Sequence, residues 1–201
     1  MKSISLAVSD MCVILSMLSI NIHKVKTHMN IHEITIGTYT RNLKNLLGIV
    51  EKAEIWAKEK KISDETVLQA RLTLDQFPLV KQIQITSDQA KSSAAVLANI
   101  PVPSFPDTEA TIQEIKERIT KTIDFLNTVT PDMIDESTLG TRTTPNRYVP
   151  GKGFTAYNHA FYSALPQFFF HYVTAYSILR HYGVQIGKAD FNGDLPLIDV
   201  K

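Results

Sequence analysis

The sequence predicts an all-α fold, a four-helix bundle, from three observations. Apolar residues recur at alternating steps of three and four along four separate stretches, which is the spacing of one helix face. Stretches with proline and glycine interrupt this spacing. The composition, 44% hydrophobic against 20% charged, is that of a globular domain with a sizeable core. Four apolar stripes are buried most simply against one another, which predicts a bundle.

The first helix is expected from about residue 31 to 60. Its opposite side carries charged residues, among them Glu54 and Lys58, which stand four apart in the order that favours an ion pair. We therefore expect that side to face solvent. The core stripe consists of Ile36, Tyr39, Leu43, Leu46, Val50, Ala53 and Ala57.

The second helix is expected after a connector at 63–73. Asp75 is its expected N-cap, because Asp accepts hydrogen bonds from free backbone N–H groups at a helix start, and Pro78 is tolerated in the first turn. The helix should continue to Ala98. Two polar residues, Gln84 and Ser87, interrupt its face, which otherwise consists of Val80, Ile83, Ala90, Ala94 and Leu97.

The third helix is expected after an extended loop. Three prolines in residues 99–106 remove backbone donors and favour extended conformations. Asp107 or Thr108 is the expected helix cap, and Pro131 marks the end of the helix. Its stripe is the most regular in the chain and consists of Ile112, Ile115, Ile119, Thr122, Leu126 and Val129.

The fourth helix is expected from about residue 155 to 182, after a long loop or short hairpin at 130–153. Pro166 should kink or divide it, and Gly183 should follow its end. The long second and third connections allow a topology other than simple up and down. The core stripe consists of Leu165, Phe168, Tyr172, Ala175, Leu179 and Tyr182.

The charges argue against two classes of partner. Lys and Arg number 21, and Asp and Glu number 20, so no overall field attracts nucleic acid or an anionic membrane. We expect neither as a partner. The one cysteine, Cys12, has no second thiol for an internal disulfide or a zinc cluster, which fits a cytoplasmic protein.

The chain is expected to divide into an N-terminal extension at 1–30, the bundle at 31–193 and a C-terminal tail at 194–201. The extension contains the most apolar run, residues 11–20, which is too short to span a bilayer. It also lacks a clear cleavage site of the kind that follows a signal peptide. An amphipathic segment laid on the bundle and a targeting segment are the alternatives to a simple extension.

Polar residues on the fourth helix form the first candidate site. Gln167 and His171 stand four apart and project from one face, in line with Thr174. Gln84 would occupy the comparable inner face of the second helix, so these residues are expected to meet in one pocket. The simpler interpretation is that they are hydrogen-bonded polar groups of the core, which need no function.

Aromatic residues surround His171 in the sequence and are expected chiefly in the core or at a dimer interface. Tyr172 is also a candidate for the lining of the pocket. Phe168, Phe169 and Phe170 are consecutive and point in different directions, so they cannot all enter one core. At least one of them is expected to face a partner chain, which predicts a homodimer.

Three segments of the chain resemble a known family. They are the fourth-helix segment Ala164–Gly183, the stretch Ala70–Asp88 with its Asp-Gln-Phe-Pro motif, and the Gly-Lys-Ala-Asp-Phe segment Gly187–Phe191. Together they are similar to an uncharacterised branch, a domain of unknown function, of the DinB/YfiT-like superfamily. The resemblance covers about residues 34–193, so it leaves the N-terminal extension unaccounted for.

The resemblance implies a DinB-like four-helix bundle. Many members hold a divalent metal with one His on helix two and an H-x-x-x-H pair on helix four, and some are thiol-dependent transferases or isomerases. Matching the family's L-R-x-x-G ending to Leu179–Gly183 puts His171 at the second helix-four ligand position and Gln167 at the first. The helix-two position falls on Gln84, or on Gln82 if the register shifts.

One His and two Gln make a poor metal site, because a Gln carbonyl is a weak donor and catalytic zinc sites use three strong ligands. We therefore expect no cofactor, with zinc or nickel at His171 as the alternative. The expected function is that of a metal-independent small-molecule-binding or stress-associated protein whose ligand is unidentified. The alternative is a metal- or thiol-dependent transferase in which His171 acts as an acid or base.

Overall fold

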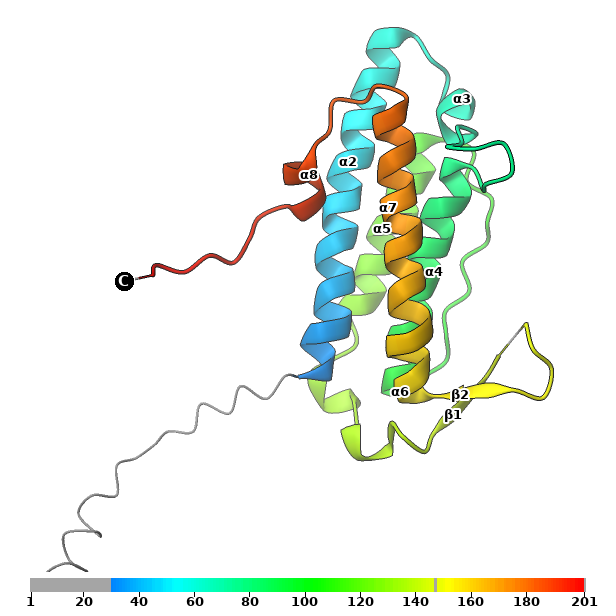
Figure 1. Ribbon diagram of the computed structural model, residues 1–201, viewed down its shortest axis with the longest axis vertical. Helices are drawn as coiled ribbons and strands as arrows, with labels where there is room; N and C mark the ends of the chain where they lie inside the picture. Colours follow the sequence, from blue (N-terminus) through cyan, green and yellow to red (C-terminus); the bar gives the residue numbers. More distant parts are fainter. Residues whose placement is uncertain (1–29, 147, 201) are drawn as a thin grey trace, which may run out of the picture.

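Four long helices packed side by side confirm the expected bundle (Figure 1). The computed structural model describes residues 30–146 and 148–200. Residues 1–29, which make up nearly all of the expected extension, lie outside the described part. The four helices are α2 (Thr38–Lys60), α4 (Leu79–Ala98), α5 (Ile112–Asn127) and α7 (Leu165–His181).

The helices do not alternate simply up and down. Figure 1 shows α2 and α7 running in one direction and α4 and α5 in the other. Because α4 and α5 are parallel, the connection between them, residues 99–111, runs back along the length of the bundle (Figure 1). Neighbouring helices pack in the order α2, α5, α4, α7, and α7 closes the ring against α2.

The expected stripes form the core, except that Tyr182, expected on the stripe of the fourth helix, is 48% exposed because it follows the end of α7. Tyr39 of α2 is fully buried and meets the ring of Phe168 edge to face, with 4.9 Å between ring centroids. The first helix starts with a π-helical turn, η1 (Glu33–Gly37), which leads directly into α2. Other large side chains that are fully buried include Phe168, Tyr172, Leu43, Leu46, Ile49, Ile83, Leu97, Ile112, Ile115, Ile119 and Leu126.

Helix α4 begins at Leu79, which corrects the expected cap at Asp75. Pro78 is the N-cap residue, with extended backbone, and the residue before a proline is disfavoured in the helical region. A start before Phe77 would therefore be strained. The Asp75 carboxylate instead accepts a hydrogen bond from the Thr73 hydroxyl at 3.0 Å. The connector also contains a short helix, α3 (Asp64–Leu68), with Ser63 as its cap.

Helix α5 begins at Ile112, which corrects the expected caps at Asp107 and Thr108. Thr111 and Glu114 form a capping box: the Thr111 hydroxyl accepts from the Glu114 backbone N–H, and the Glu114 carboxylate accepts from that of Thr111. This T-x-x-E signature is visible in the sequence. After α5, two short 3-10 helices follow, η2 (Pro131–Met133) and η3 (Glu136–Thr138).

A short antiparallel hairpin confirms the expectation for residues 130–153. Its strands are β1 (Thr143–Pro145) and β2 (Gly153–Thr155), and Thr144 pairs with Phe154. The fourth helix then consists of α6 (Ala156–Asn158), a π-helical segment η4 (His159–Ala164) and α7. It is therefore divided just before Pro166, and it ends before Gly183, which has the left-handed φ of +100°.

A last short helix, α8 (Lys188–Asn192), lies beside α2 (Figure 1). The Tyr172 hydroxyl and the Asn45 side-chain amide both donate to the Phe191 carbonyl, at 2.9 and 3.1 Å. Gly193 has φ +60°, and a Cβ there would lie 2.2 Å from the Asn45 side chain. Glycine therefore lets the chain pass close to α2 before the tail leaves the bundle.

Across residues 30–146 and 148–200, none of the helices combines the length and the hydrophobicity that a membrane crossing needs.

Candidate functional site

His171 lies on α7 at its contact with α4 and is half-buried. Its Nδ1 is 2.7 Å from Oε1 of Gln82, a fully buried residue of α4. The other end of the Gln82 amide, Nε2, donates to the Phe77 carbonyl at 2.9 Å. One glutamine thus joins the imidazole to the chain just before α4.

These two contacts determine the tautomer of His171. The Phe77 carbonyl only accepts, so the Gln82 nitrogen must face it and the Gln82 oxygen must face the imidazole. Because that oxygen also only accepts, Nδ1 of His171 carries the proton. A neutral imidazole then keeps a lone pair on Nε2, which accepts no hydrogen bond from the described residues.

Burial sets the protonation state of the same ring. It lowers the pKa of His171 below its ordinary value of 6.5, because a half-buried imidazolium loses part of its hydration. The imidazole is therefore neutral at pH 7. Its Nε2 is suited to accept a hydrogen bond or a proton from a bound molecule.

Gln167 lies one helical turn before His171 and also contacts α4. Its Oε1 accepts from Nε2 of Gln89 at 3.2 Å, and its Nε2 donates to the Ser163 hydroxyl at 2.9 Å. Further along, the Ser92 hydroxyl lies 3.3 Å from Nε2 of His159. A line of polar side chains therefore follows the contact between α4 and the fourth helix, and we call Gln82, Gln89, Gln167 and His171 the α4/α7 polar seam.

The structure places Gln84 away from His171 and so corrects the expected register. Two residues along a helix correspond to a rotation of about 200°, so Gln82 and Gln84 point to nearly opposite sides of α4. Gln82, the alternative choice, meets His171, whereas Nε2 of Gln84 donates to the Glu109 carboxylate at 2.8 Å. Gln84 thus belongs to a different set of polar residues.

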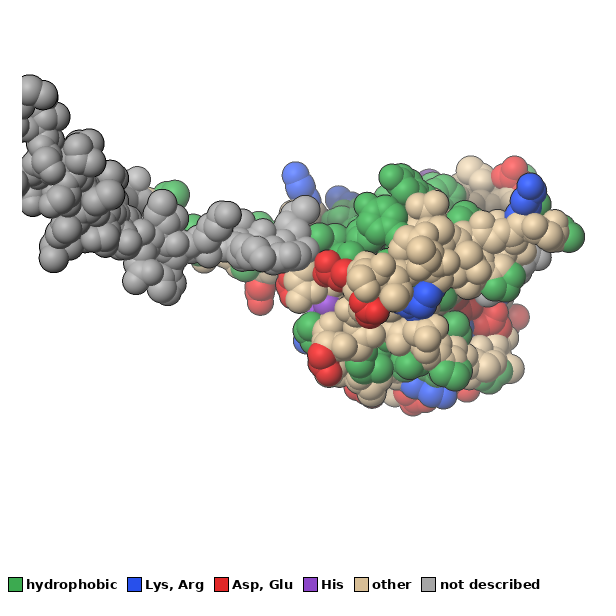
Figure 2. Space-filling model, turned by 90° about the horizontal axis from the view of Figure 1, so that it is seen from below, with side chains coloured by type: hydrophobic (Ala, Val, Ile, Leu, Met, Phe, Trp, Pro, Cys, Tyr) green, Lys and Arg blue, Asp and Glu red, His purple; other side chains and the backbone are tan. Residues whose placement is uncertain are grey.

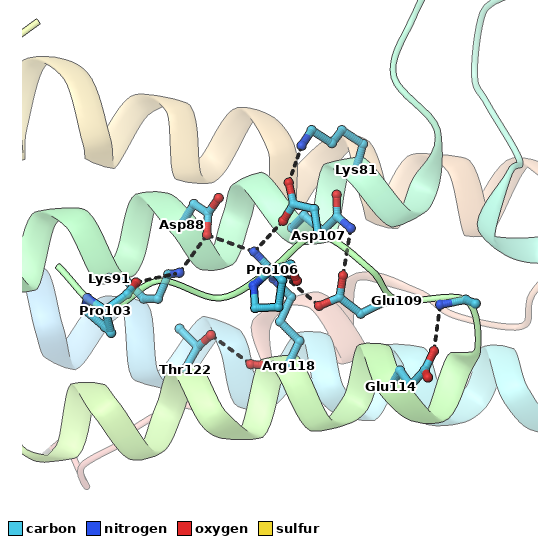
Figure 3. Close-up of polar contacts among 12 residues, drawn as sticks. Lys81, Asp88, Lys91, Pro103, Pro106, Asp107, Glu109, Glu114, Arg118 and Thr122 are labelled. Atoms are coloured by element: carbon cyan, nitrogen blue, oxygen red, sulfur yellow. Dashed lines mark hydrogen bonds and ion pairs between the residues drawn. The ribbon is translucent and has the colours of Figure 1, made fainter. Parts of the chain in front are cut away.

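That second set is an ionic network around the buried side chain of Arg118 (Figure 3). The Arg118 side chain is 2% exposed and contacts the carboxylates of Asp88, Asp107 and Glu109 at 2.8–2.9 Å. Lys91, 4% exposed, contacts Asp88 at 2.9 Å. Sequence reasoning missed this network, because its members come from α4, α5 and the connection between them, and only the fold brings them together.

The remaining candidates have partners inside the chain. The Thr174 hydroxyl donates to the Phe170 carbonyl one turn earlier, at 2.7 Å. The Tyr172 hydroxyl donates to the Phe191 carbonyl, and its ring stacks on that of Phe191 with 4.5 Å between centroids. Both side chains therefore stabilise the fold at these positions.

The donor set of the seam does not suit a divalent transition metal. Gln82 and Gln167 offer carboxamide oxygens, and each oxygen already accepts a hydrogen bond. The strong donor that remains is Nε2 of His171, whereas catalytic zinc sites use three strong protein ligands. Within the described residues, no group of three or more His, Cys, Asp or Glu is placed to hold a metal ion.

Comparison with known proteins assigns the fold to a family. The family model described as "Domain of unknown function (DUF1993)" matches residues 31–192. A crystal structure of a DinB family member protein from Shewanella denitrificans is 34% identical and superposes with a TM-score of 0.78. The match covers 84% of this chain and 95% of that one. No curated protein matches the chain.

Proposed function

The chain belongs to the DUF1993 family of domains of unknown function, and from this premise we propose that it is a DinB-like small-molecule-binding protein that works without a metal ion. The site is the α4/α7 polar seam. The observation that carries the proposal is the contact of Gln82 with His171, which holds a proton on Nδ1, so that the imidazole, kept neutral by its burial, offers the Nε2 lone pair to a ligand. The ligand is a small molecule that donates a hydrogen bond to this nitrogen, such as a hydroxyl, phenol or thiol compound.

The test is a fragment screen against metal-free full-length protein, followed by the NMR signals of the His171 ring. Binders with a hydrogen-bond donor should shift these signals and lose affinity as the pH falls through the pKa of His171, because a protonated Nε2 no longer accepts. His171→Ala should weaken them about tenfold, the effect of losing one hydrogen bond in a desolvated site.

His181→Ala is the matched control, because His181 is an exposed histidine at the end of the same helix. It should leave binding unchanged. Equal binding by the two alanine variants would refute the proposed site. Stoichiometric zinc or nickel in protein purified without a chelator or a His tag would refute the metal-independent function.

The same observation supports an alternative, a DinB-like transferase that acts on a thiol. A neutral imidazole can take the proton of a bound thiol and so generate the nucleophilic thiolate. The alternative predicts turnover of a thiol with an electrophilic acceptor by the wild-type protein and loss of that turnover in His171→Ala. Binding without turnover would favour the first function.

We also propose that the protein is a homodimer of the cytoplasm. Phe168 is fully buried, whereas Phe170 is 59% exposed on α7. Tyr162 and Val173 lie eight residues before and three after Phe170 and are also exposed, so they extend the same helix face. Light scattering should give twice the monomer mass, and Phe170→Asp should give the monomer mass. A monomeric wild-type protein would contradict the proposal.

A further inference from the structure

A groove lies on the side of the bundle opposite the α4/α7 polar seam. Its walls are the first turns of α2, the end of α5 and the start of the C-terminal tail, and its volume is about 590 Å³. Figure 1 shows the beginning of α2 beside the end of α5 at one end of the bundle. A volume of this size is typical of small-molecule sites in proteins.

The floor of the groove is apolar and its rim is basic. Ile36, Leu126 and Val129 lie beneath it and are nearly fully buried. Arg41 and Lys44 stand three residues apart on α2, line the groove and are exposed. Among the described residues that line the groove, one has a carboxylate side chain, Asp194. The groove therefore carries a local excess of positive charge.

This excess is local. The whole chain has a net charge of +1, so no overall field attracts anions. Seen from the end of the bundle where α2 begins, acidic and basic side chains are mixed with hydrophobic ones, without one sign of charge covering that end (Figure 2). The two cations on one wall are therefore a local property of the groove and do not belong to a larger basic surface.

Arg41 is partly fixed in place. One of its terminal nitrogens, Nη2, donates to the Asn192 carbonyl at 2.6 Å. The guanidinium has five N–H donors, so this contact leaves others to bind an anion in the planar, two-bond manner that carboxylates and phosphates favour. A side chain held at one point loses less conformational freedom when it binds a ligand.

We propose that this groove binds a small molecule with an anionic group and an apolar body. Arg41 and Lys44 hold the anionic group, and the floor formed by Ile36, Leu126 and Val129 covers the apolar body. Carboxylates and phosphate esters share this chemistry. The site is separate from the α4/α7 polar seam, because α2 and α5 are the helices on the other side of the bundle.

The site is also connected to α8. The Asn192 carbonyl that accepts from Arg41 belongs to the last residue of α8, and Asn45, which lines the groove, donates to the Phe191 carbonyl. A ligand that binds Arg41 should therefore change the NMR signals of the next residue, Gly193. This gives a structural readout that does not depend on affinity alone.

The experiment measures binding to the full chain by calorimetry with four probes: octanoate, acetate, 1-octanol and inorganic phosphate. Octanoate should bind at least about tenfold more tightly than the other three, because it alone has both the charge and the apolar body. Octyl phosphate, as a fifth probe, distinguishes a preference for carboxylate from one for a phosphate ester. Equal binding of 1-octanol or of inorganic phosphate would overturn the proposal.

Lys44→Gln and Arg41→Gln should each weaken octanoate about tenfold, the effect of losing a charged hydrogen-bond donor. Lys44→Gln is the decisive variant, because replacing Arg41 also removes its hydrogen bond to the Asn192 carbonyl of α8. The matched control is Lys60→Gln, an exposed lysine at the far end of α2. Unchanged affinity in Lys44→Gln would overturn the proposal. His171→Ala should leave octanoate binding intact, so the failure of one site is distinguishable from the failure of the other.

Discussion

Gln82 lies between two groups that each make one hydrogen bond with its amide. The Phe77 carbonyl needs a donor, and Nδ1–H of His171 needs an acceptor. A carboxamide supplies one of each and adds no charge. The buried position of Gln82 makes both contacts valuable, since an unsatisfied buried polar group costs about 1–3 kcal/mol.

Gln82→Glu should raise the pKa of His171, because a carboxylate beside the ring favours the imidazolium. NMR titration of the ring signals measures this change directly. Gln89→Glu is the control: Gln89 lies two turns later on α4 and contacts Gln167. A pKa of His171 that moved equally in both variants would show that Gln82 has no special contact with the ring.

Arg118 is the second residue whose removal has a clear expected effect. Arg118→Met should destabilise the protein by about 1–3 kcal/mol, because it leaves the Glu109 carboxylate, 10% exposed, without its cation, whereas Asp88 and Asp107 stay partly exposed to water. Urea unfolding gives the value. Lys58→Met, which removes an exposed ion pair with Glu54 on α2, should cost no more than about 0.5 kcal/mol. Similar losses in the two variants would mean that the network contributes no more than a surface pair.

For individual residues, the sequence predicted part of the α4/α7 polar seam. The spacing of four between Gln167 and His171 indicated a shared helix face, and both residues do contact α4. The choice between Gln82 and Gln84 depended on the rotation of α4 about its axis. Both residues are buried, so the apolar stripe could not decide which of them faces α7.

The starts of α4 and α5 show that a proline or a capping box decides where a helix begins, even where an Asp that could cap it stands nearby. Asp75 and Asp107 are residues that commonly cap helices, yet α4 starts after Pro78 and α5 starts after Thr111. In α5 the capping box is reinforced by Asp64 of α3, whose carboxylate accepts from the Ile112 backbone N–H at 2.9 Å. Hydrogen bonds therefore hold the first turn of α5 both within the helix and to α3.

Thr111→Ala should destabilise the protein by about 1 kcal/mol, because the Glu114 backbone N–H loses its acceptor. Asp75→Ala should change stability by less than about 0.5 kcal/mol, since Asp75 is exposed and caps no helix. Thermal unfolding of the two variants side by side measures the difference. A larger loss of stability in Asp75→Ala than in Thr111→Ala would mean that Asp75 is the more important cap.

The long elements were predictable and their ends were less so. Stripes such as that of α5 identified all four helices, since a helix face repeats over many residues and tolerates single exceptions. A helix start depends on one or two residues, and several nearby residues can serve. Proline at 78 and the Thr111–Glu114 pair were the decisive local signals.

For the whole molecule, the ionic network links stability to pH. Burial alone would raise the pKa of Asp107, but the hydrogen bond from Lys81 and the charge of Arg118 hold it below its ordinary value of 3.8. A carboxylate with a lowered folded-state pKa contributes stability above the unfolded-state pKa and loses it as the pH falls through the folded-state pKa. Acid should therefore weaken the network.

Asp107→Asn tests this link. The fall in unfolding free energy between pH 5 and pH 3 should be smaller in the variant than in the wild-type protein, by less than about 1 kcal/mol, because about a third of the Asp107 side chain is exposed. Urea unfolding at several pH values measures the slope. The other carboxylates with lowered pKa values stay in place, so some acid sensitivity should remain. An unchanged slope would exclude Asp107 as a contributor.

The overall arrangement of the helices was only partly predictable. The long second connection indicated that simple alternation was not required, and the structure shows α4 and α5 in parallel (Figure 1). The apolar stripes do not indicate in which direction a helix runs, because the spacing of apolar residues is the same read from either end. The partners that hold the connection, chiefly Arg118 and Lys91, lie on the helices at its two ends, and only the folded arrangement of those helices brings them against it.

That connection also determines what would happen to a chain cut between Pro103 and Pro106. The two fragments would carry α2 with α4 and α5 with α7, whereas the main contacts join α2 to α5 and α4 to α7. Lys91 binds the Pro103 carbonyl and Arg118 binds the Pro106 carbonyl, so each cut end would keep an anchor. A nicked protein should therefore migrate as one species on a native gel and separate into two fragments when denatured.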